Sequence, residues 1–383
     1  MDVPSLKQTH PQKHYFKTLC TFMFYLGMGD LWYEKTELTY YMKKIYAVWM
    51  VVANGFIIVF LFNELLSFAR PDLTAREWND LAVFSFAHPL LYAKVVVLYF
   101  FKGRIKFVME RLLEGSRPIF HSLELERKSV KQFAIYCFAV TAASYAVLGS
   151  AMIEGIRQHF IQVVYFPNPS QSGPYVTVVR FLVEIHWYYI VAMMSTMDCL
   201  ALCSLITVGH KFKVLRMYFH QLRIRILENK EQKSKKELAK EFKKDFVIGI
   251  KLHSDALWCA RNVQESMGFL YSIQVAAPQL FLRIGHLDDA TLLVWPTDST
   301  KYLRCGASCG PALRHLQAID IFQASLVGTA MFYSGWEVCR PGPDLRVLVV
   351  VAVQMSQIPV YMTAFGVIIL SHNNFISVSI QSS

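Results

Sequence analysis

The segment IHWYYIVAMMSTMDCLALCSLITVG at Ile185–Gly209 is largely apolar and is followed directly by the basic segment His210–Lys251. The first segment is long enough to cross a bilayer, since about 20 apolar residues in a helix span the hydrocarbon. The second segment holds thirteen Lys and Arg residues. Because cytoplasmic loops retain Lys and Arg, this junction predicts a membrane helix that ends in the cytoplasm.

Six further apolar runs lie to either side of this segment. Four are long and two are weaker, and they occupy Ile45–Asn63, Leu81–Phe101, Phe133–Ile153, Val347–Leu370, Met267–Leu282 and Ile321–Trp336. The head (Met1–Lys44) holds six basic residues and the second loop (Lys102–Lys131) holds eight, whereas the first and third loops hold two each. We therefore predict an all-α membrane protein, a seven-transmembrane-helix bundle with a cytoplasmic N-terminus and an extracellular C-terminus.

Composition supports this class of protein. The chain is 54% apolar and 17% charged, which is not typical of a soluble domain. Topology and contact with anionic lipid account for the formal charge of +11, so a nucleic-acid partner is not expected. The head contains no apolar stretch of signal-peptide length, and the run from Ile45 would act as the insertion signal.

Several segments outside the apolar runs have helical patterns. Arg104–Leu113 is amphipathic, and Lys211–Leu227 and Phe246–Ser266 are predicted to be helices that flank a solvated, mobile segment at Glu228–Lys244. We expect these helices to pack together beneath the membrane, as an anchor or an oligomer interface. Tyr15–Tyr41 is expected at the headgroup level. The loop His159–Pro174 is rich in Pro and Gly and is expected to form an outer cap.

Polar residues within or beside the runs have two interpretations. His88, Lys94, His186, Asp198, Gln274 and Gln354 could mark function inside the bundle, or could form ordinary interhelical hydrogen bonds. Lys94 could snorkel or pair with Asp198.

Enzyme and metal signatures are not found. There is no Walker loop, HExxH or GxSxG, so no catalytic residue and no cofactor are predicted. Five cysteines of the predicted cytoplasm and spans should be reduced thiols, namely Cys20, Cys137, Cys199, Cys203 and Cys259. Cys305 and Cys309 could pair, and no second Cys pair follows them, so a metal site is not expected.

The C-terminal quarter carries a family resemblance. It contains FQASLVGTAMFYSGWEVC from Phe322 and DLRVLVVVAVQMSQIPVYMTAFGVIILSHNNFISVSI from Asp344, and HSDALWCARNVQESMGFLYSIQ precedes them from His253. These stretches resemble the signature of insect odorant receptors, particularly those of moths. The matching positions are Ala330, Tyr333, Trp336, Gln357, Pro359, Ala364, Gly366, Leu370, Ser371 and Phe375.

The resemblance implies a function. Members of this family are odorant-gated, nonselective cation channels in which a variable tuning subunit and one co-receptor form a heterotetramer. The implied partners are the odorant co-receptor, a small hydrophobic odorant or pheromone, and membrane lipid. The implied location is the cell membrane of an olfactory sensory neuron dendrite, with the chain crossing several times. Tyr333, Trp336, Gln357 and Pro359 would belong to the anchor motif, and Ser371 and Phe375 to the pore helix.

Two departures from the family are expected to matter. By resemblance, the first half of Val347–Leu370 belongs to the anchor and the pore helix begins near Leu370, which would leave that helix incomplete at Ser383. Arg283–His315 is polar and irregular, which suggests a faulty or truncated gene model, or a variant transcript. The expected divisions are 1–44 (cytoplasmic), 45–209 (helices one to four, with a helical loop at 102–131), 210–266 (anchor loop), 267–340 (helices five and six, with the atypical connection 283–315) and 341–383 (anchor segment and incomplete pore helix).

A ligand of this kind needs an aromatic and aliphatic site with few polar groups, in the outer half of the bundle. The candidates from the sequence are Phe86, His88, Tyr92, Tyr145, Met152, His186, Trp187, Ile190 and Met194, with Phe322 and Ser325 from the sixth run. Packing between helices is the competing interpretation for each residue.

Three other classes of membrane protein compete with this interpretation. A gustatory receptor shares the topology and stays the alternative, because its Thr-Tyr and Gln-Phe pattern in the last helix is missing here but truncation could have removed it. A G-protein-coupled receptor would need an outside head, together with an Asp/Glu-Arg-Tyr and an Asn-Pro-x-x-Tyr that do not occur. A transporter or membrane enzyme is disfavoured because no internal repeats or catalytic motifs are found.

Overall fold

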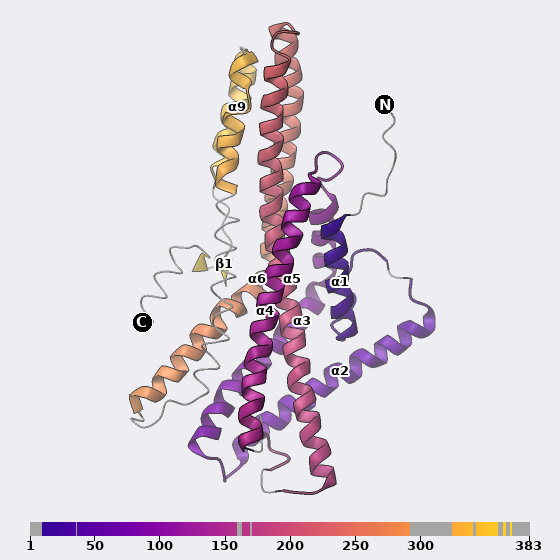
Figure 1. Ribbon diagram of the computed structural model, residues 1–383, viewed down its shortest axis with the longest axis vertical. Helices are drawn as coiled ribbons and strands as arrows, with labels where there is room; N and C mark the ends of the chain where they lie inside the picture. The colour runs from indigo at the N-terminus through magenta and orange to yellow at the C-terminus, as the bar shows by residue number, and fades with distance from the viewer. Residues whose placement is uncertain are drawn as a thin grey trace.

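The computed structural model describes residues 10–35, 37–158, 163–168, 171–291, 324–339, 342–358, 363–364 and 368–369, with the backbone alone at 76, 79, 83, 147, 150–158, 274–291, 363–364 and 368–369. The described chain is almost entirely helical (Figure 1). The elements in chain order are α1 (Pro11–Tyr25), α2 (Tyr40–Leu66), η1 (Ser67–Ala69), α3 (Ala75–Glu114), α4 (Leu123–Gln158), α5 (Pro174–Glu228), α6 (Lys235–Thr291), a helical segment at 324–332, η2 (Trp336–Cys339), α9 (Pro343–Ser356), β1 (Thr363–Ala364) and β2 (Ile368–Ile369). The two short strands pair antiparallel, Thr363 with Ile369 and Ala364 with Ile368.

Local sequence explains where the long helices begin. Thr74 and Glu77 form a capping box at the start of α3, in which Glu77 N–H donates to Thr74 Oγ1 at 3.2 Å and Thr74 N–H donates to Glu77 Oε2 at 2.8 Å. Ser234 and Glu237 make the same reciprocal pair before α6. α5 starts at Pro174 after Gly173, whose φ of 133° favours glycine.

Helix α5 forms the centre of the bundle. It packs against α1, α2, α3, α4 and α6, and residues 195–212 are buried on all sides. A helix that is apolar all round belongs in a core. α2 is equally apolar, but its most apolar window is only 22% buried, against 78% for α5. We therefore describe α5 as the core helix and α2 as an outer helix with an exposed apolar surface.

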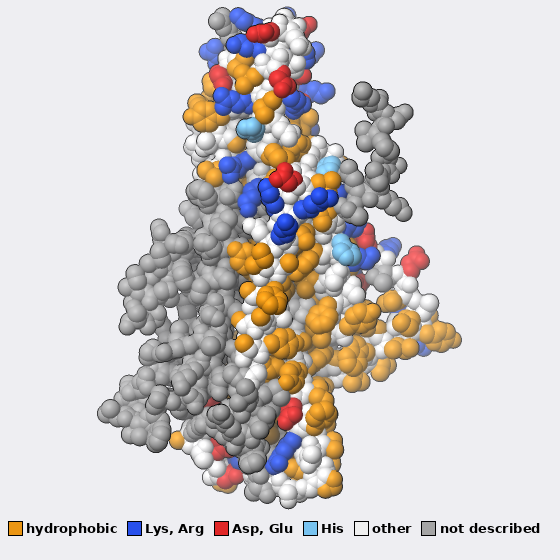
Figure 2. Space-filling model, viewed as in Figure 1, with side chains coloured by type: hydrophobic (Ala, Val, Ile, Leu, Met, Phe, Trp, Pro, Cys, Tyr) orange, Lys and Arg blue, Asp and Glu red, His pale blue; other side chains and the backbone are white. Residues whose placement is uncertain are grey.

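The two ends of the bundle differ in charge. The hairpin end holds the α3–α4 and α5–α6 connections, and the cap end holds the α2–α3 and α4–α5 connections (Figure 1). Figure 2 shows Lys and Arg gathered toward the hairpin end, while apolar side chains cover much of the visible surface nearer the cap end. Three described helical stretches are long and apolar enough to cross a membrane: Tyr40–Ala69, Asp80–Glu114 and Pro174–Glu228. The chain is a membrane protein.

The helices of the hairpin end pack together, as the sequence predicted. Asp255 of α6 accepts from Lys211 Nζ of α5 at 2.8 Å and from Arg111 Nε of α3 at 2.9 Å. The Arg111 guanidinium also lies 4.5 Å from the centre of the Trp258 ring. The predicted helices at Arg104–Leu113, Lys211–Leu227 and Phe246–Ser266 are confirmed as continuations of α3, α5 and α6.

The structure adds to one prediction about the segments beside these helices and contradicts another. The head is not only an interfacial stretch, because α1 buries Phe16, Cys20 and Met23 completely or nearly so against the bundle. Trp32 is 5% exposed. Glu228–Lys244 is not one solvated segment either, because α6 starts at Lys235 and its Leu238 and Phe242 side chains are buried. The period of these apolar residues was hidden by the surrounding Lys and Glu.

The apolar run Val347–Leu370 is not a single helix. α9 ends at Ser356, Gln357 caps it, and Leu345, Val349 and Ala352 are buried along one side. This break agrees with the division that the family resemblance implied. The cysteines predicted to be reduced are free and buried. Cys305, Cys309 and the connection 283–315 beyond Thr291 lie outside the described residues.

Candidate functional site

A buried ion pair lies at mid-height in the bundle. Lys94 Nζ of α3 donates to Asp198 Oδ1 of α5 at 2.9 Å, and their side chains are 2% and 14% exposed. The predicted pairing is therefore confirmed. Each charge satisfies the other where neither would be stable alone, so this pair fixes α3 against α5.

Nearer the cap end, seven side chains form a cluster between α2, α3 and α5. We call it the aromatic–histidine cluster, and it consists of Phe56, Phe60, Glu64, Phe84, His88, His186 and Trp187. The His186 ring stacks on Phe60 with centroids 4.9 Å apart, and the His88 ring stacks on Phe84 at 5.5 Å. The two histidine rings lie 6.5 Å apart and nearly perpendicular.

Helical spacing explains how these side chains meet. Phe56, Phe60 and Glu64 recur every fourth residue on α2, so they share one face of that helix. Phe84 and His88 are likewise one turn apart on α3. The cluster thus draws side chains from one face of α2, one face of α3 and the adjacent positions 186 and 187 of α5.

The polar groups of the cluster are incompletely satisfied. His88 Nδ1 and Glu64 Oε2 are 2.7 Å apart, and both side chains are buried. Within the described part of the chain, the second Glu64 oxygen, Oε1, is buried without a hydrogen-bond partner. Both ring nitrogens of His186 are also without a partner there, although this side chain is 0% exposed. Buried polar atoms are nearly always paired, so these three atoms need an explanation.

The loop between α4 and α5 covers the cluster at the cap end. Val164 packs with Phe60 and Val183. The loop backbone is tied to Asn63, whose Oδ1 accepts from Phe166 N–H at 2.9 Å and whose Nδ2 donates to Phe166 O at 2.8 Å. The predicted cap is therefore observed over residues 163–168, and its place outside the membrane stays a prediction.

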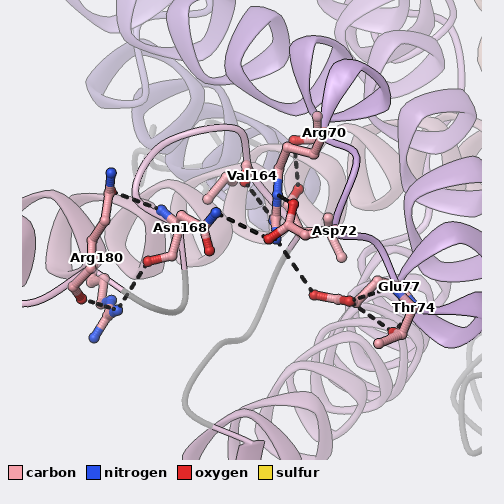
Figure 3. Close-up of polar contacts among 10 residues, drawn as sticks. Arg70, Asp72, Thr74, Glu77, Val164, Asn168 and Arg180 are labelled. Atoms are coloured by element: carbon pink, nitrogen blue, oxygen red, sulfur yellow. Dashed lines mark hydrogen bonds and ion pairs between the residues drawn. The ribbon is translucent and has the colours of Figure 1, made fainter.

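Arg70 joins this loop to the start of α3 (Figure 3). Its guanidinium donates to Val164 O at 3.2 Å and to both carboxylate oxygens of Asp72 at 3.0 Å. Asp72 Oδ2 also accepts from Asn168 Nδ2 at 3.1 Å. The Arg70 hydrogen bonds lower the pKa of Asp72 to about 2, so this connection stays charged at neutral pH.

The structure brings three of the predicted site residues together and leaves others apart. His88, His186 and Trp187 belong to the cluster, and Ile190 is buried one turn below His186. Tyr92 Oη donates to Asn54 Oδ1 at 3.3 Å, and Met194 is half-buried. Exposed positions are taken by Phe86 (59%), Tyr145 (38%) and Ser325.

The predicted motif residues are placed as follows. Tyr333 is exposed, Trp336 Nε1 donates to Phe332 O at 2.9 Å at the start of η2, and Gln357 caps α9. The side chains of Met152, Phe322, Pro359, Ser371 and Phe375 lie outside those that the structure describes.

Sequence reasoning missed Phe56, Phe60, Glu64 and Phe84. A Phe within an apolar run is not marked by its type, since any of the apolar neighbours could face the interior. Glu64 falls just beyond the run Ile45–Asn63, but its place one turn after Phe60 and two turns after Phe56 was a signal that could have found it.

The cluster has the composition of a binding site. Among the described residues, no group of three His, Cys, Asp or Glu side chains could hold a metal ion. The cluster offers aromatic surface with a few polar atoms, which is the usual composition of a small-molecule site.

Comparison with known proteins agrees with this fold. No protein-family model matches the sequence, and no relative is found among curated proteins. The chain is similar to the solved structure of the insect olfactory receptor OR5 from Machilis hrabei in complex with eugenol, with a TM-score of 0.71 and 9% identity over 97% of this chain and 96% of that one. It is also similar to a second solved structure of the insect olfactory receptor OR5 from Machilis hrabei, with a TM-score of 0.72 and 8% identity over 97% of this chain and 96% of that one. The chain therefore has an insect odorant receptor-like fold.

Proposed function

We propose that this protein is an odorant receptor, the tuning subunit of an odorant-gated nonselective cation channel formed with the odorant co-receptor. The observation that carries the proposal is the likeness in fold to olfactory receptor OR5 over 97% of the chain. That neighbour was solved in complex with eugenol. Both neighbours are named as olfactory receptors, which is consistent with a protein that is not an enzyme.

The proposed topology has seven spans, a cytoplasmic head and an extracellular C-terminus. The charge asymmetry of the bundle supports this orientation, because Lys and Arg gather at the hairpin end (Figure 2). Exposed apolar residues of α2 such as Val51 (73%) and Phe62 (62%) suit contact with lipid tails. The proposed location is the dendritic membrane of an olfactory sensory neuron.

The proposed ligand site is the aromatic–histidine cluster with the adjoining outer halves of the helices. His88, His186 and Trp187 are the central residues. The other residues proposed from the sequence are Phe86, Tyr92, Tyr145, Met152, Ile190, Met194, Phe322 and Ser325.

We further propose that the hairpin end is the anchor that assembles subunits. Support comes from the ion pairs that fix α3, α5 and α6 there, and from the apolar side chains that α9 exposes, including Val347 (62%) and Met355 (57%). Ser371 and Phe375 are proposed as pore-helix residues by resemblance. Co-receptor subunits are the proposed partners.

Co-expression with the odorant co-receptor tests the proposal. Membrane current is recorded during an odorant panel with G-protein signalling blocked. A fast inward current that the co-receptor alone does not give is the expected result, and silence despite surface delivery would contradict it. Trp187→Ala should weaken the response without reducing surface delivery. Antibody access to a tag on the head of intact cells would instead favour a G-protein-coupled receptor.

A further inference from the structure

The unpaired atoms of the aromatic–histidine cluster point to a particular ligand chemistry. His186 is 0% exposed, and neither of its ring nitrogens has a hydrogen-bond partner among the residues that the structure describes. A neutral imidazole carries one N–H donor and one nitrogen acceptor. Leaving such groups buried and unpaired is unfavourable by an amount comparable to a hydrogen bond. The ring is instead suited to a partner that enters the cluster from outside the chain.

Glu64 supplies a third unpaired atom and restricts the choice. A proton shared between Glu64 Oε2 and His88 Nδ1, 2.7 Å apart, leaves Oε1 as a hydrogen-bond acceptor, whichever of the two groups holds the proton. The cluster therefore offers two acceptor sites and one donor. A hydroxyl is the smallest group that can both accept from the His186 N–H and donate to one of the acceptors, so it pairs two of these three atoms at once.

The surroundings restrict the rest of the ligand. The His186 ring is flanked by Phe60 at 4.9 Å and Phe56 at 5.7 Å, and the His88 ring by Phe84 and Trp187. Aromatic walls favour an apolar body and give no compensation for a second charge. A carboxylate would face the Glu64 acceptor, so an acid is disfavoured while an alcohol is accommodated.

We propose that His186 is the polar anchor for the hydroxyl of a small apolar alcohol, with Glu64 as a second contact that His88 orients. This inference rests on the proposed function for the site. It assigns alcohols as the ligand class and predicts discrimination against ethers of the same size, because an ether oxygen accepts a hydrogen bond but does not donate one.

Binding to the purified, detergent-solubilised full chain tests the inference directly. The probes are 1-hexanol, 1-octanol and 1-decanol, each with the methyl ether and the hydrocarbon of equal heavy-atom count, and octanoate. The readouts are the change in tryptophan fluorescence, to which the buried Trp187 contributes, and the ligand-induced shift in melting temperature. Since partition into detergent is the same for every variant, the change in affinity from one variant to the next isolates the site.

His186→Phe keeps a ring and removes both nitrogens, and should weaken alcohol binding about tenfold to hundredfold while changing the hydrocarbons less than about threefold. The ethers can only accept from His186, so their loss should be smaller than that of the alcohols. His186→Gln retains a donor and an acceptor and should keep most of the preference for alcohols. The control is Tyr188→Phe, which removes a hydroxyl from a side chain on the same helix that is 42% exposed, and should leave all affinities unchanged.

Three results would overturn the inference: no preference of the native chain for alcohols in any of the three sizes, an equal loss for all probes in His186→Phe, or octanoate binding as tightly as 1-octanol. Current recordings with the co-receptor separate this from the proposed function. Selective alcohol binding without current would support the anchor and contradict the receptor. Current evoked equally by alcohols and their ethers would support the receptor and contradict the anchor.

Discussion

Reversing the charges of the Lys94–Asp198 pair gives the sharpest test of the bundle. The two side chains are 2.9 Å apart and almost fully buried, and they join α3 to α5 between the cluster and the hairpin end. Lys94→Asp alone places two acidic groups together, and Asp198→Lys alone places two basic groups together. The double variant restores an ion pair with the partners exchanged.

The geometry sets the expected magnitude. Two unit charges at 2.9 Å attract by about 6 kcal/mol at an effective dielectric constant of about 20, and desolvation offsets most of that attraction. The net value of the pair is therefore small, but removing one partner leaves a buried charge that costs about 3–5 kcal/mol. Each single reversal should lower the apparent melting temperature by roughly 10 °C. The double variant should recover at least half of that loss.

The assay is the thermal melting of detergent-solubilised protein, together with surface delivery in cells. The matched control reverses Lys128 and Glu124, a pair on α4 whose side chains are 66% and 77% exposed, and it should change melting by no more than about 1–2 °C. If the double variant melts as low as the worse single variant, the two residues do not act as a pair and the reasoning fails.

Three further predictions concern the hairpin end. Gly249→Ala should destabilise the chain by about 1–3 kcal/mol, because an added Cβ would lie 2.6 Å from the buried Phe219 ring. In the control Gly103→Ala the added Cβ meets nothing within 4 Å, so this variant should be neutral or slightly stabilising in the same melting assay. Equal effects of the two substitutions would refute the packing argument. Asp255→Ala should cost about 3 kcal/mol, since it leaves a buried basic partner without its ion pair, and a chemical-denaturation midpoint that does not move would contradict this. Burial lowers the pKa of His253 to about 4, so this residue adds no pH dependence to stability above about pH 6.5. As the pH falls below about 6.5, the unfolded chain binds a proton at His253 that the folded chain does not, and the free energy of unfolding should drop by about 2 kcal/mol at pH 5. His253→Leu should remove that part of the pH dependence of the melting temperature, and an unchanged pH dependence would contradict the assignment.

The sequence carried enough information for the helices but not for their burial. Apolar runs mark α2 and α5 equally well, yet α5 is the buried core and α2 is largely exposed. In a membrane, both lipid and protein neighbours are apolar, so hydropathy does not distinguish a lipid-facing helix from a central one. The buried face of α1 was missed for a related reason, because Phe16, Cys20 and Met23 are separated by polar residues that also suit the headgroup level.

The candidate site was partly predictable for a physical reason. His88, His186 and the Lys94–Asp198 pair stood out because ionisable residues are costly in apolar runs, and the structure places all four in the bundle interior. The phenylalanines that surround the histidines did not stand out, since an apolar residue in an apolar run has no distinguishing cost. Whether such a residue lines the cluster depends on which face of its helix it occupies, and that follows only from the packing of the helices.

The buried polar residues of this chain fall into two kinds, and the difference connects stability with function. Lys94 and Asp198 satisfy each other, so their positions are explained by the fold alone. His186 is equally buried and satisfies nothing within the described chain, and Glu64 keeps one oxygen unpaired beside it in the cluster. A fold selected for stability alone would do as well or better with an apolar residue at position 186, since replacing an unsatisfied buried polar group by an apolar one of similar shape is neutral or stabilising. His186 is then best explained by a hydrogen bond that forms when a ligand is present. The melting temperature of the ligand-free chain therefore tests whether His186 contributes to ligand binding or to packing. His186→Phe should melt at the same temperature as the native chain or higher while binding alcohols less tightly, and a variant that both melts lower and loses all ligands alike would assign His186 to packing instead.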